Sequence, residues 1–182
     1  NYKKIKIAHH NYAFSSKDKL IGIAPFARHR CKEYSMKNII NFINLLDKSW
    51  QILIFGAPGD EEKKIIKLCG KKSNRHVISS NYTLEQQMAI MSNLDAMISM
   101  DSANGHIASL FGTDVITIWG ATHPNAGYAP LNQPIENSIV PDLNKFPDLP
   151  VTIYGSSCPY NYVEAINTIE YSRILERLNK II

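Results

Sequence analysis

A run of small polar residues, Asp101-Ser102-Ala103-Asn104-Gly105-His106, follows the apolar stretch 96–100 and leads into a segment that ends at Gly112. The pattern predicts a buried strand, a tight turn and a short helix with Gly112 as its C-terminal cap. The first turn of a helix directs free backbone N–H groups and the positive end of the dipole outward, and small side chains let an anion approach. The sequence therefore predicts a phosphate site on the amides of Ala103, Asn104, Gly105 and His106.

Two earlier segments carry charges that suit the same chemistry. Arg28, Arg30 and Lys32 place three cations within five residues, and a departing diphosphate needs such charge. A solvated basic loop is the alternative interpretation of this cluster. Asp60 and Glu61 follow a predicted strand, where a carboxylate can accept the hydroxyl protons of a ribose. Acids that only stabilise a helix N-terminus have the same pattern, so both interpretations stay open.

The side chains of the turn divide by charge. Asp101 is an anion and repels phosphate, so we assign it, with Ser102, to the hydroxyl groups of a sugar. His106 can reach a phosphate or pack half-buried, and the sequence favours neither. Ser102 and His106 are near neighbours, which raises a Ser/His/Asp hydrolase as an alternative, but the G-x-S-x-G turn and an evident third partner are missing.

Composition argues against metal and disulfide chemistry. The chain has no D-x-D motif, and His9-His10 and His123 are dispersed, so we expect no metal and no other cofactor. Cys31, Cys69 and Cys158 lack C-x-x-C spacing, which argues against a zinc site or a disulfide framework and favours a reducing, cytoplasmic compartment.

The net charge of +4 is concentrated at the N-terminus. Five lysines and one acid lie in residues 1–20, whereas the rest of the chain is balanced. We therefore expect a basic linker at 1–19, a folded domain at 20–182 and no nucleic-acid partner. Apolar runs are too short for a membrane span.

Strands and helices are predicted to alternate at short intervals. Apolar runs indicate strands at 20–24, 50–55, 76–79, 96–100 and 115–120, with helices after Ser35, at 60–68, at 84–94 and at 104–111. Ser35 is a candidate helix cap, and Thr83 with Gln86 forms a candidate capping box. This order predicts an α/β, Rossmann-like parallel sheet with helices on both faces.

The loops that leave the strands should meet at one crevice. We expect the segments 25–35, 56–62, 101–106 and 120–128 to converge there. Residues 121–160 hold seven of the nine prolines and predict an irregular arm, followed by a C-terminal helix over 162–182.

Four ordered motifs resemble those of glycosyltransferase family 9, which includes the ADP-heptose:lipopolysaccharide heptosyltransferases. They are Gly22–Ala27 with Lys32-Glu33-Tyr34, Phe55–Glu61, Asp101–Ala108 and Trp119–Pro124. The resemblance runs from about residue 20 to about residue 130, and the segment around Cys158-Pro159 is also similar.

The resemblance implies the C-terminal, donor-binding half of a GT-B fold. Its activity would be inverting transfer of a sugar from an ADP-heptose-like donor to a lipopolysaccharide core or related lipid-linked glycan, without a metal, at the cytoplasmic face of the bacterial membrane. In the family, the preceding half binds the acceptor and supplies the general base. This chain alone should therefore hold no catalytic residue and transfer little or nothing.

The resemblance also implies roles for single residues. Lys32, followed by Tyr34, matches the lysine that meets the phosphates, Asp60 matches an acid on the ribose, and Tyr82 falls near the base pocket. An ordinary surface tyrosine is the alternative for Tyr82. Ser35 stands where proline is usual, and Ala103 where glycine is frequent. A Rossmann-like nucleotide-binding or interaction module without catalysis is the alternative for the whole chain.

Overall fold

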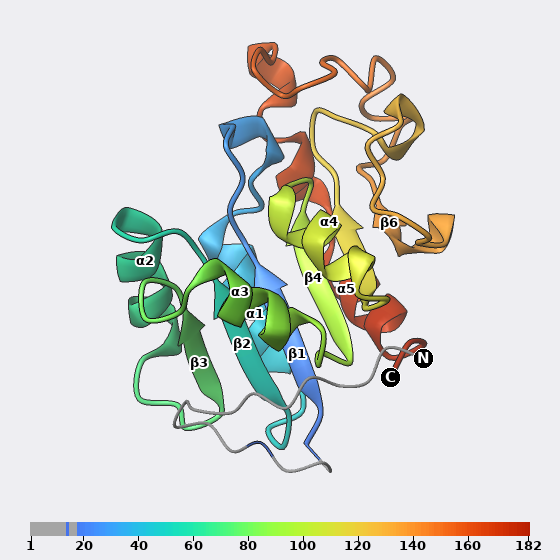
Figure 1. Cartoon of the computed structure of the whole chain (residues 1–182). Coiled ribbons are helices and arrows are strands. Elements are labelled where there is room, and N and C mark those ends of the chain that lie inside the picture. The colour runs from blue at the N-terminus through green and yellow to red at the C-terminus, as the bar shows by residue number, and fades with distance from the viewer. Residues whose placement is uncertain (1–13, 15–17) are drawn as a thin grey trace.

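A six-stranded parallel sheet forms the centre of the computed structural model, which describes residue 14 and residues 18–182 (Figure 1). The strands are β1 (Leu20–Ala24), β2 (Gln51–Phe55), β3 (Arg75–Ile78), β4 (Ala96–Met100), β5 (Asp114–Ile118) and β6 (Ser138–Ile139). They lie in the order β3-β2-β1-β4-β5-β6, and every neighbouring pair is parallel. The predicted Rossmann-like fold class is confirmed.

The strand order reverses between β1 and β4. From β1 the chain builds outward through β2 and β3, then returns to place β4 on the other side of β1. The loops after β1 and β4 therefore diverge at the carboxyl edge of the sheet, which leaves a crevice between them.

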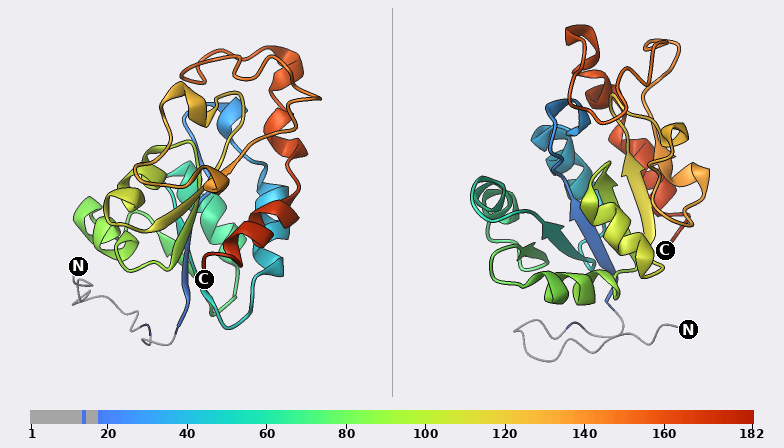
Figure 2. Two further views of the ribbon diagram at one scale, coloured as in Figure 1. Left: turned by 90° about the vertical axis from the view of Figure 1, so that its right-hand side faces the viewer. Right: turned by 45° about the horizontal axis from the view of Figure 1, so that its top comes forward.

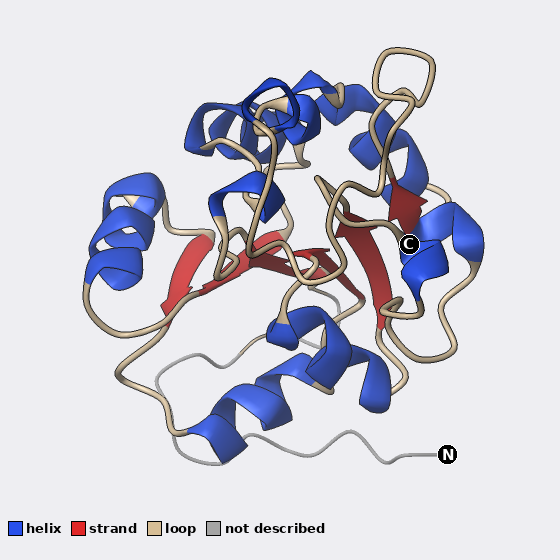
Figure 3. Cartoon of the chain, turned by 90° about the horizontal axis from the view of Figure 1, so that it is seen from above, coloured by secondary structure: helices blue, strands red, loops and turns tan. Residues whose placement is uncertain are grey.

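Helices cover both faces of the sheet (Figure 3). They are α1 (Met36–Leu45), α2 (Asp60–Cys69), α3 (Leu84–Met91), α4 (Ala103–Leu110) and α5 (Tyr171–Leu178). Successive strand residues point to opposite faces. Ile52 and Ile54 pack in the core with side chains of α1, α2 and α5, whereas Leu53 and Phe55 pack with side chains of α3 and α4.

Both predicted helix caps are present. The Ser35 hydroxyl accepts a hydrogen bond from the Asn38 N–H at 3.2 Å, at the start of α1. Thr83 and Gln86 form a reciprocal capping box at the start of α3. Gly112 follows α4 with φ of +77°, so it ends the helix in the left-handed conformation that glycine favours.

The C-terminal segment is less helical than predicted. Instead of a helix over 162–182, α5 follows two short 3-10 turns at Tyr160–Tyr162 and Ala165–Thr168. Between these turns and α5, the Ile169 carbonyl accepts a hydrogen bond from the Tyr34 hydroxyl. The Asn167 side chain accepts one from the Ser35 N–H at 2.7 Å. These bonds to the chain before α1 hold the stretch out of helical geometry.

Much of the segment 121–160 lies above the carboxyl ends of the strands, near the loop that follows β1 (Figure 2). It is irregular apart from short 3-10 turns and the two-residue strand β6, which pairs with β5. A strand this short has no periodicity for a sequence pattern to reveal. The predicted linker at 1–19 lies outside the described residues, except for residues 14, 18 and 19.

Candidate functional site

A cavity of about 900 Å³ lies at the carboxyl edge of β1, β2 and β4. Its lining comes from five segments: Phe26, Ala27, Arg28, His29 and Lys32; Gly56, Ala57, Pro58 and Glu61; Gln87; Asp101, Ser102, Ala103 and Asn104; and Tyr154 and Ser156. Three of the four loops expected to converge do line it. The fourth, 120–128, does not line it, although its Thr122 hydroxyl donates a hydrogen bond to Asp101.

A buried ion pair lies on one side of this cavity. Lys32 Nζ is 2.8 Å from Asp101 Oδ2, and these side chains are only 14% and 8% exposed. The same carboxylate oxygen accepts a hydrogen bond from Thr122 Oγ1 at 2.8 Å. A desolvated cation requires such a partner, so each charge holds the other in place. Lys32 and Asp101, which the sequence assigned to different groups of a ligand, are thus direct partners.

Two close backbone approaches fix the loop that carries Lys32. A Cβ at Gly155 would stand 2.4 Å from Lys32 Cδ, and Gly155 has φ of +82°. A Cβ at Gly120 would stand 2.0 Å from the Cys31 carbonyl oxygen, which accepts a hydrogen bond from the Ala121 N–H at 3.0 Å. Glycine at both positions lets these segments close around Lys32.

The N-terminus of α4 faces the cavity without a side-chain cap. Ser102 has extended backbone, and its side chain makes no hydrogen bond to the helix. Its hydroxyl lies 3.3 Å from that of Ser99 instead. Ala103 and Asn104 line the cavity. The N–H groups of the first helical turn have no intrahelical partner, so they can bind an anion that enters here.

Two other residues of the predicted phosphate turn lie elsewhere. Gly105 is buried against β4, and a Cβ there would stand 3.0 Å from the Ser99 hydroxyl. It therefore serves the packing of α4 on the sheet. His106 is partly exposed but does not line the cavity, so the packing interpretation fits it.

The cations of the loop after β1 also differ in whether they reach the cavity. Arg28 and Lys32 line the cavity, whereas Arg30 turns to an exposed ion pair with Glu164 at 3.2 Å. Tyr34 is in the core, 1% exposed, and its hydroxyl bonds Ile169. Burial first, then the nearby charge of Glu170, raises the pKa of Tyr34 to about 12.

At the end of the cavity opposite Lys32, only one of the two predicted acids lines the wall. Glu61 lines it, and its carboxylate also accepts a hydrogen bond from the Ala57 N–H at 2.7 Å. Asp60 is exposed and pairs with Lys63 at 3.0 Å. Tyr82 is 8% exposed and packs in the core with residues of α3, so it offers no open face for stacking.

Sequence reasoning missed four polar lining residues, His29, Gln87, Tyr154 and Ser156. The Gln87 amide donates a hydrogen bond to the Tyr82 carbonyl at 3.2 Å, and nothing in the α3 sequence marks that residue as facing a cavity. Tyr154 precedes Gly155, which does signal a turn. Which crevice that turn would reach depends on the path of the whole arm.

Metal-binding and membrane-spanning features are absent from the part of the chain that the structure describes. Within residues 14 and 18–182, His, Cys, Asp and Glu side chains do not gather in threes that could hold a metal ion. His9 and His10 lie outside those residues. The same residues contain no helix with the length and apolarity needed to cross a bilayer.

The fold and site define a Rossmann-like α/β domain with a charged cavity at its topological switch point. A sequence model of glycosyltransferase family 9 (heptosyltransferase) matches residues 2–154. The chain belongs to this family, and the match extends beyond the residues that carry the resemblance. Comparison with curated protein sequences gives no match.

Solved structures of heptosyltransferases share the fold. The E. coli ADP-heptose lipopolysaccharide heptosyltransferase II matches 93% of this chain at 18% identity, with a TM-score of 0.70. E. coli heptosyltransferase WaaC with ADP matches 91% of this chain at 14% identity, with a TM-score of 0.67. The iron-containing heptosyltransferase TibC of enterotoxigenic E. coli, solved with ADP-D-β-D-heptose, matches 98% of this chain at 11% identity, with a TM-score of 0.62.

The chain spans about half the length of these proteins, because the matches cover 48%, 45% and 48% of their respective chains. At such identities the likeness concerns the fold. The iron named for TibC belongs to that protein, and the expectation of a metal-free site here stays a prediction.

Proposed function

We propose that this chain is the donor-binding half of an inverting glycosyltransferase that uses an ADP-heptose-like donor. The observation that carries the proposal is the uncapped N-terminus of α4 and the Lys32 ammonium in the lining of one cavity. A nucleotide-sugar diphosphate needs both backbone donors and a cation. Family membership and the ligands named for WaaC and TibC support ADP and ADP-heptose as the donor class.

The diphosphate would bind between Arg28, Lys32 and the amides of Ala103 and Asn104. As the bond to the sugar breaks, negative charge builds on the phosphate, and fixed cations stabilise that charge. Lys32 then divides its charge between Asp101 and the phosphate. Asp101 and Ser102 would accept and donate hydrogen bonds to sugar hydroxyls.

The nucleoside would occupy the other end of the cavity. Glu61 can accept ribose hydroxyl protons while it keeps its bond to the Ala57 N–H, because a carboxylate has two oxygens and about four acceptor sites. Phe26 and Pro58 supply apolar walls beside it. The proposed site therefore uses Glu61 in place of Asp60 and Tyr82, and it does not include His106.

Transfer would require residues beyond this chain. Similar structures are about twice as long. The family resemblance implies that the acceptor site and the general base belong to the other half. We propose that the chain binds donor but transfers little alone. The acceptor would be a glycan linked to lipid at the cytoplasmic membrane face.

Isothermal titration calorimetry with ADP, UDP and GDP tests the proposal. We expect ADP to bind best, and Lys32→Ala to weaken it about tenfold or more through loss of a charged phosphate contact. Arg30→Ala is the matched control, because Arg30 lies in the same loop but pairs with exposed Glu164. Circular dichroism establishes that each variant is folded.

Two results would reject the proposal. Equal, negligible heats for all three nucleotides would indicate an interaction module without a donor site. An equal loss in Arg30→Ala and Lys32→Ala would indicate nonspecific attraction to a basic loop.

A further inference from the structure

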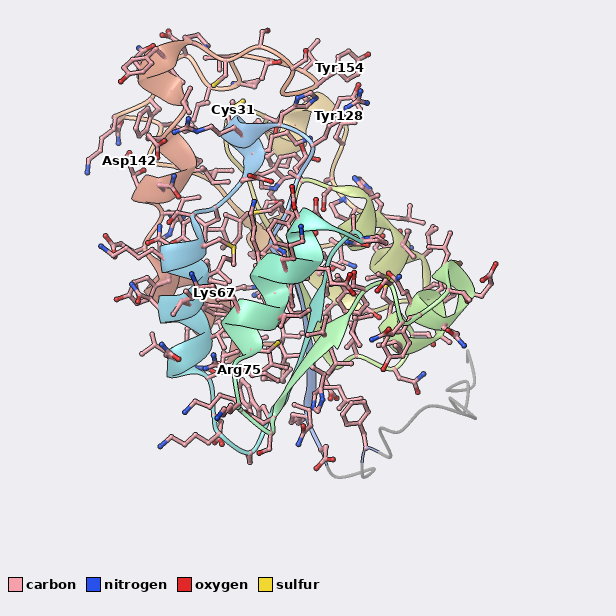
Figure 4. All side chains as sticks on the ribbon, turned by 90° about the vertical axis from the view of Figure 1, so that its left-hand side faces the viewer. Cys31, Lys67, Arg75, Tyr128, Asp142 and Tyr154 are labelled. Carbon is pink, nitrogen blue, oxygen red and sulfur yellow. The ribbon has the colours of Figure 1, made fainter. Side chains whose placement is uncertain are left out.

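An exposed aromatic pair stands at the rim of the cavity. Tyr154 lines the cavity although it is 66% exposed, and Tyr128 is 36% exposed. Their ring centroids are 5.9 Å apart, with the planes at 64° in an edge-to-face arrangement. Figure 4 shows the two side chains together at the top of the molecule, on the same side of the arm. Neither has a role in the site proposed above.

The segment that carries Tyr154 is held in place by its neighbours. The Val151 N–H donates to the Ala121 carbonyl at 3.1 Å. The Gly155 N–H donates to Thr152 Oγ1 at 3.1 Å, and the Cys31 thiol donates to the Gly155 carbonyl at 3.4 Å. Gly155 also rests on the stem of Lys32. Tyr154 is therefore presented beside the cationic end of the cavity by an anchored turn.

Tyr128 stands against Tyr154 and does not itself line the cavity. Its hydroxyl shares a hydrogen bond with Tyr154, and this bond first, then burial and the charges of Tyr154 and Asp101, raises the pKa of Tyr128. Tyr154 thus lies beside Lys32 through its neighbour Gly155, and Tyr128 packs against it. An aromatic ring this exposed leaves apolar surface in contact with water, and such a ring marks a binding surface when it lines a cavity.

We propose that the Tyr128–Tyr154 pair forms the wall of the subsite for the sugar ring of the donor. This inference rests on the proposed function, in which the diphosphate lies at Lys32 and the nucleoside at Glu61. A pyranose presents a face of C–H groups that packs on the negative face of an aromatic ring, while its hydroxyls turn to Asp101 and Ser102. The pair would then contribute to donor affinity only through the sugar.

Calorimetry with two probes, ADP and ADP-heptose, separates this contribution. Tyr154→Ala should leave the Kd for ADP within about twofold and weaken ADP-heptose about three- to tenfold, the range of one aromatic contact. Tyr154→Phe keeps the ring and should retain most of the affinity. Tyr160→Ala is the matched control, because Tyr160 lies on the same arm, is 95% exposed and does not line this cavity.

Each other outcome overturns the inference. Equal losses for ADP and ADP-heptose in Tyr154→Ala would place the ring on the nucleotide. Unchanged affinity for both ligands would show that the ring does not contact the donor. If the unaltered chain binds ADP and ADP-heptose with equal affinity, only the inference fails. If it binds neither ligand, the proposed function fails and the inference falls with it.

Discussion

At the scale of single residues, the site depends on a lysine that already has an anionic partner. Lys32 and Asp101 meet at 2.8 Å with little exposure, and Thr122 bonds the same carboxylate oxygen. Removing one member of such a pair leaves a buried charge alone, which costs more than the pair itself contributes. The same pairing lowers the positive charge that an incoming phosphate would meet.

Asp101→Asn should therefore change stability and affinity in opposite directions. We expect the free energy of unfolding to fall by about 2–4 kcal/mol, because Lys32 loses its counter-charge. ADP should bind several-fold more tightly, because the ammonium is no longer shared and the repelling anion is gone. Urea denaturation and calorimetry measure the two effects. Thr122→Val is the control, and we expect it to cost about 1 kcal/mol. Weaker ADP binding in Asp101→Asn would contradict the account.

Tyr34 predicts a loss of stability at alkaline pH. Its pKa rises from an ordinary value of 10.0 to about 12 in the folded chain. Its contribution is thus complete below pH 10 and is lost between pH 10 and 12, where the unfolded tyrosine ionises first. The difference corresponds to about 2–3 kcal/mol. Tyr34→Phe should flatten this part of the stability profile by about that amount, and exposed Tyr160→Phe should not. An unchanged profile in Tyr34→Phe would contradict this assignment.

At the scale of elements, five of the six strands and most helices could be predicted because their signals are local. Alternating apolar runs marked β1 to β5, and side-chain caps marked the starts of α1 and α3. The end of the chain was misjudged because its helical spacing is overridden by distant partners, Ser35 and Tyr34. Charge and spacing predicted Lys32, Asp101 and Glu61, which line the cavity. They could not separate Asp60 from Glu61, which depends on the direction of each side chain at the start of α2.

Gly120 couples two segments, and its substitution should affect both stability and binding. A methyl group would stand 2.0 Å from the Cys31 carbonyl oxygen, so the backbone before Lys32 must shift. We expect Gly120→Ala to lower the free energy of unfolding by about 2–3 kcal/mol and to weaken ADP binding. Gly127→Ala is the control, since its φ of +88° is strained for alanine but its surroundings are open. It should cost about 1 kcal/mol and leave ADP affinity intact. Equal effects of both substitutions would contradict the proposed coupling.

At the scale of the whole molecule, a Rossmann-like sheet brings segments distant in sequence to one edge. The loop after β1, the turn after β2, the start of α4 and the turn at Tyr154 line one cavity. The convergence of the first three follows from the strand order, so the sequence could predict it. The contribution of the arm could not be predicted, because irregular chain has no period that fixes its path. The chain that carries this cavity spans about half the length of its structural relatives.

The most direct test of the central claim is an NMR titration of the ¹⁵N-labelled chain with ADP. We predict that the largest amide shift changes fall on Ala103, Asn104 and Lys32, with a second set at Ala57 and Glu61. A separate cavity of about 540 Å³, lined by Asn161 and Val163 among others, provides the comparison. Largest changes there, or none at the start of α4, would contradict the assignment of this cavity as the donor site.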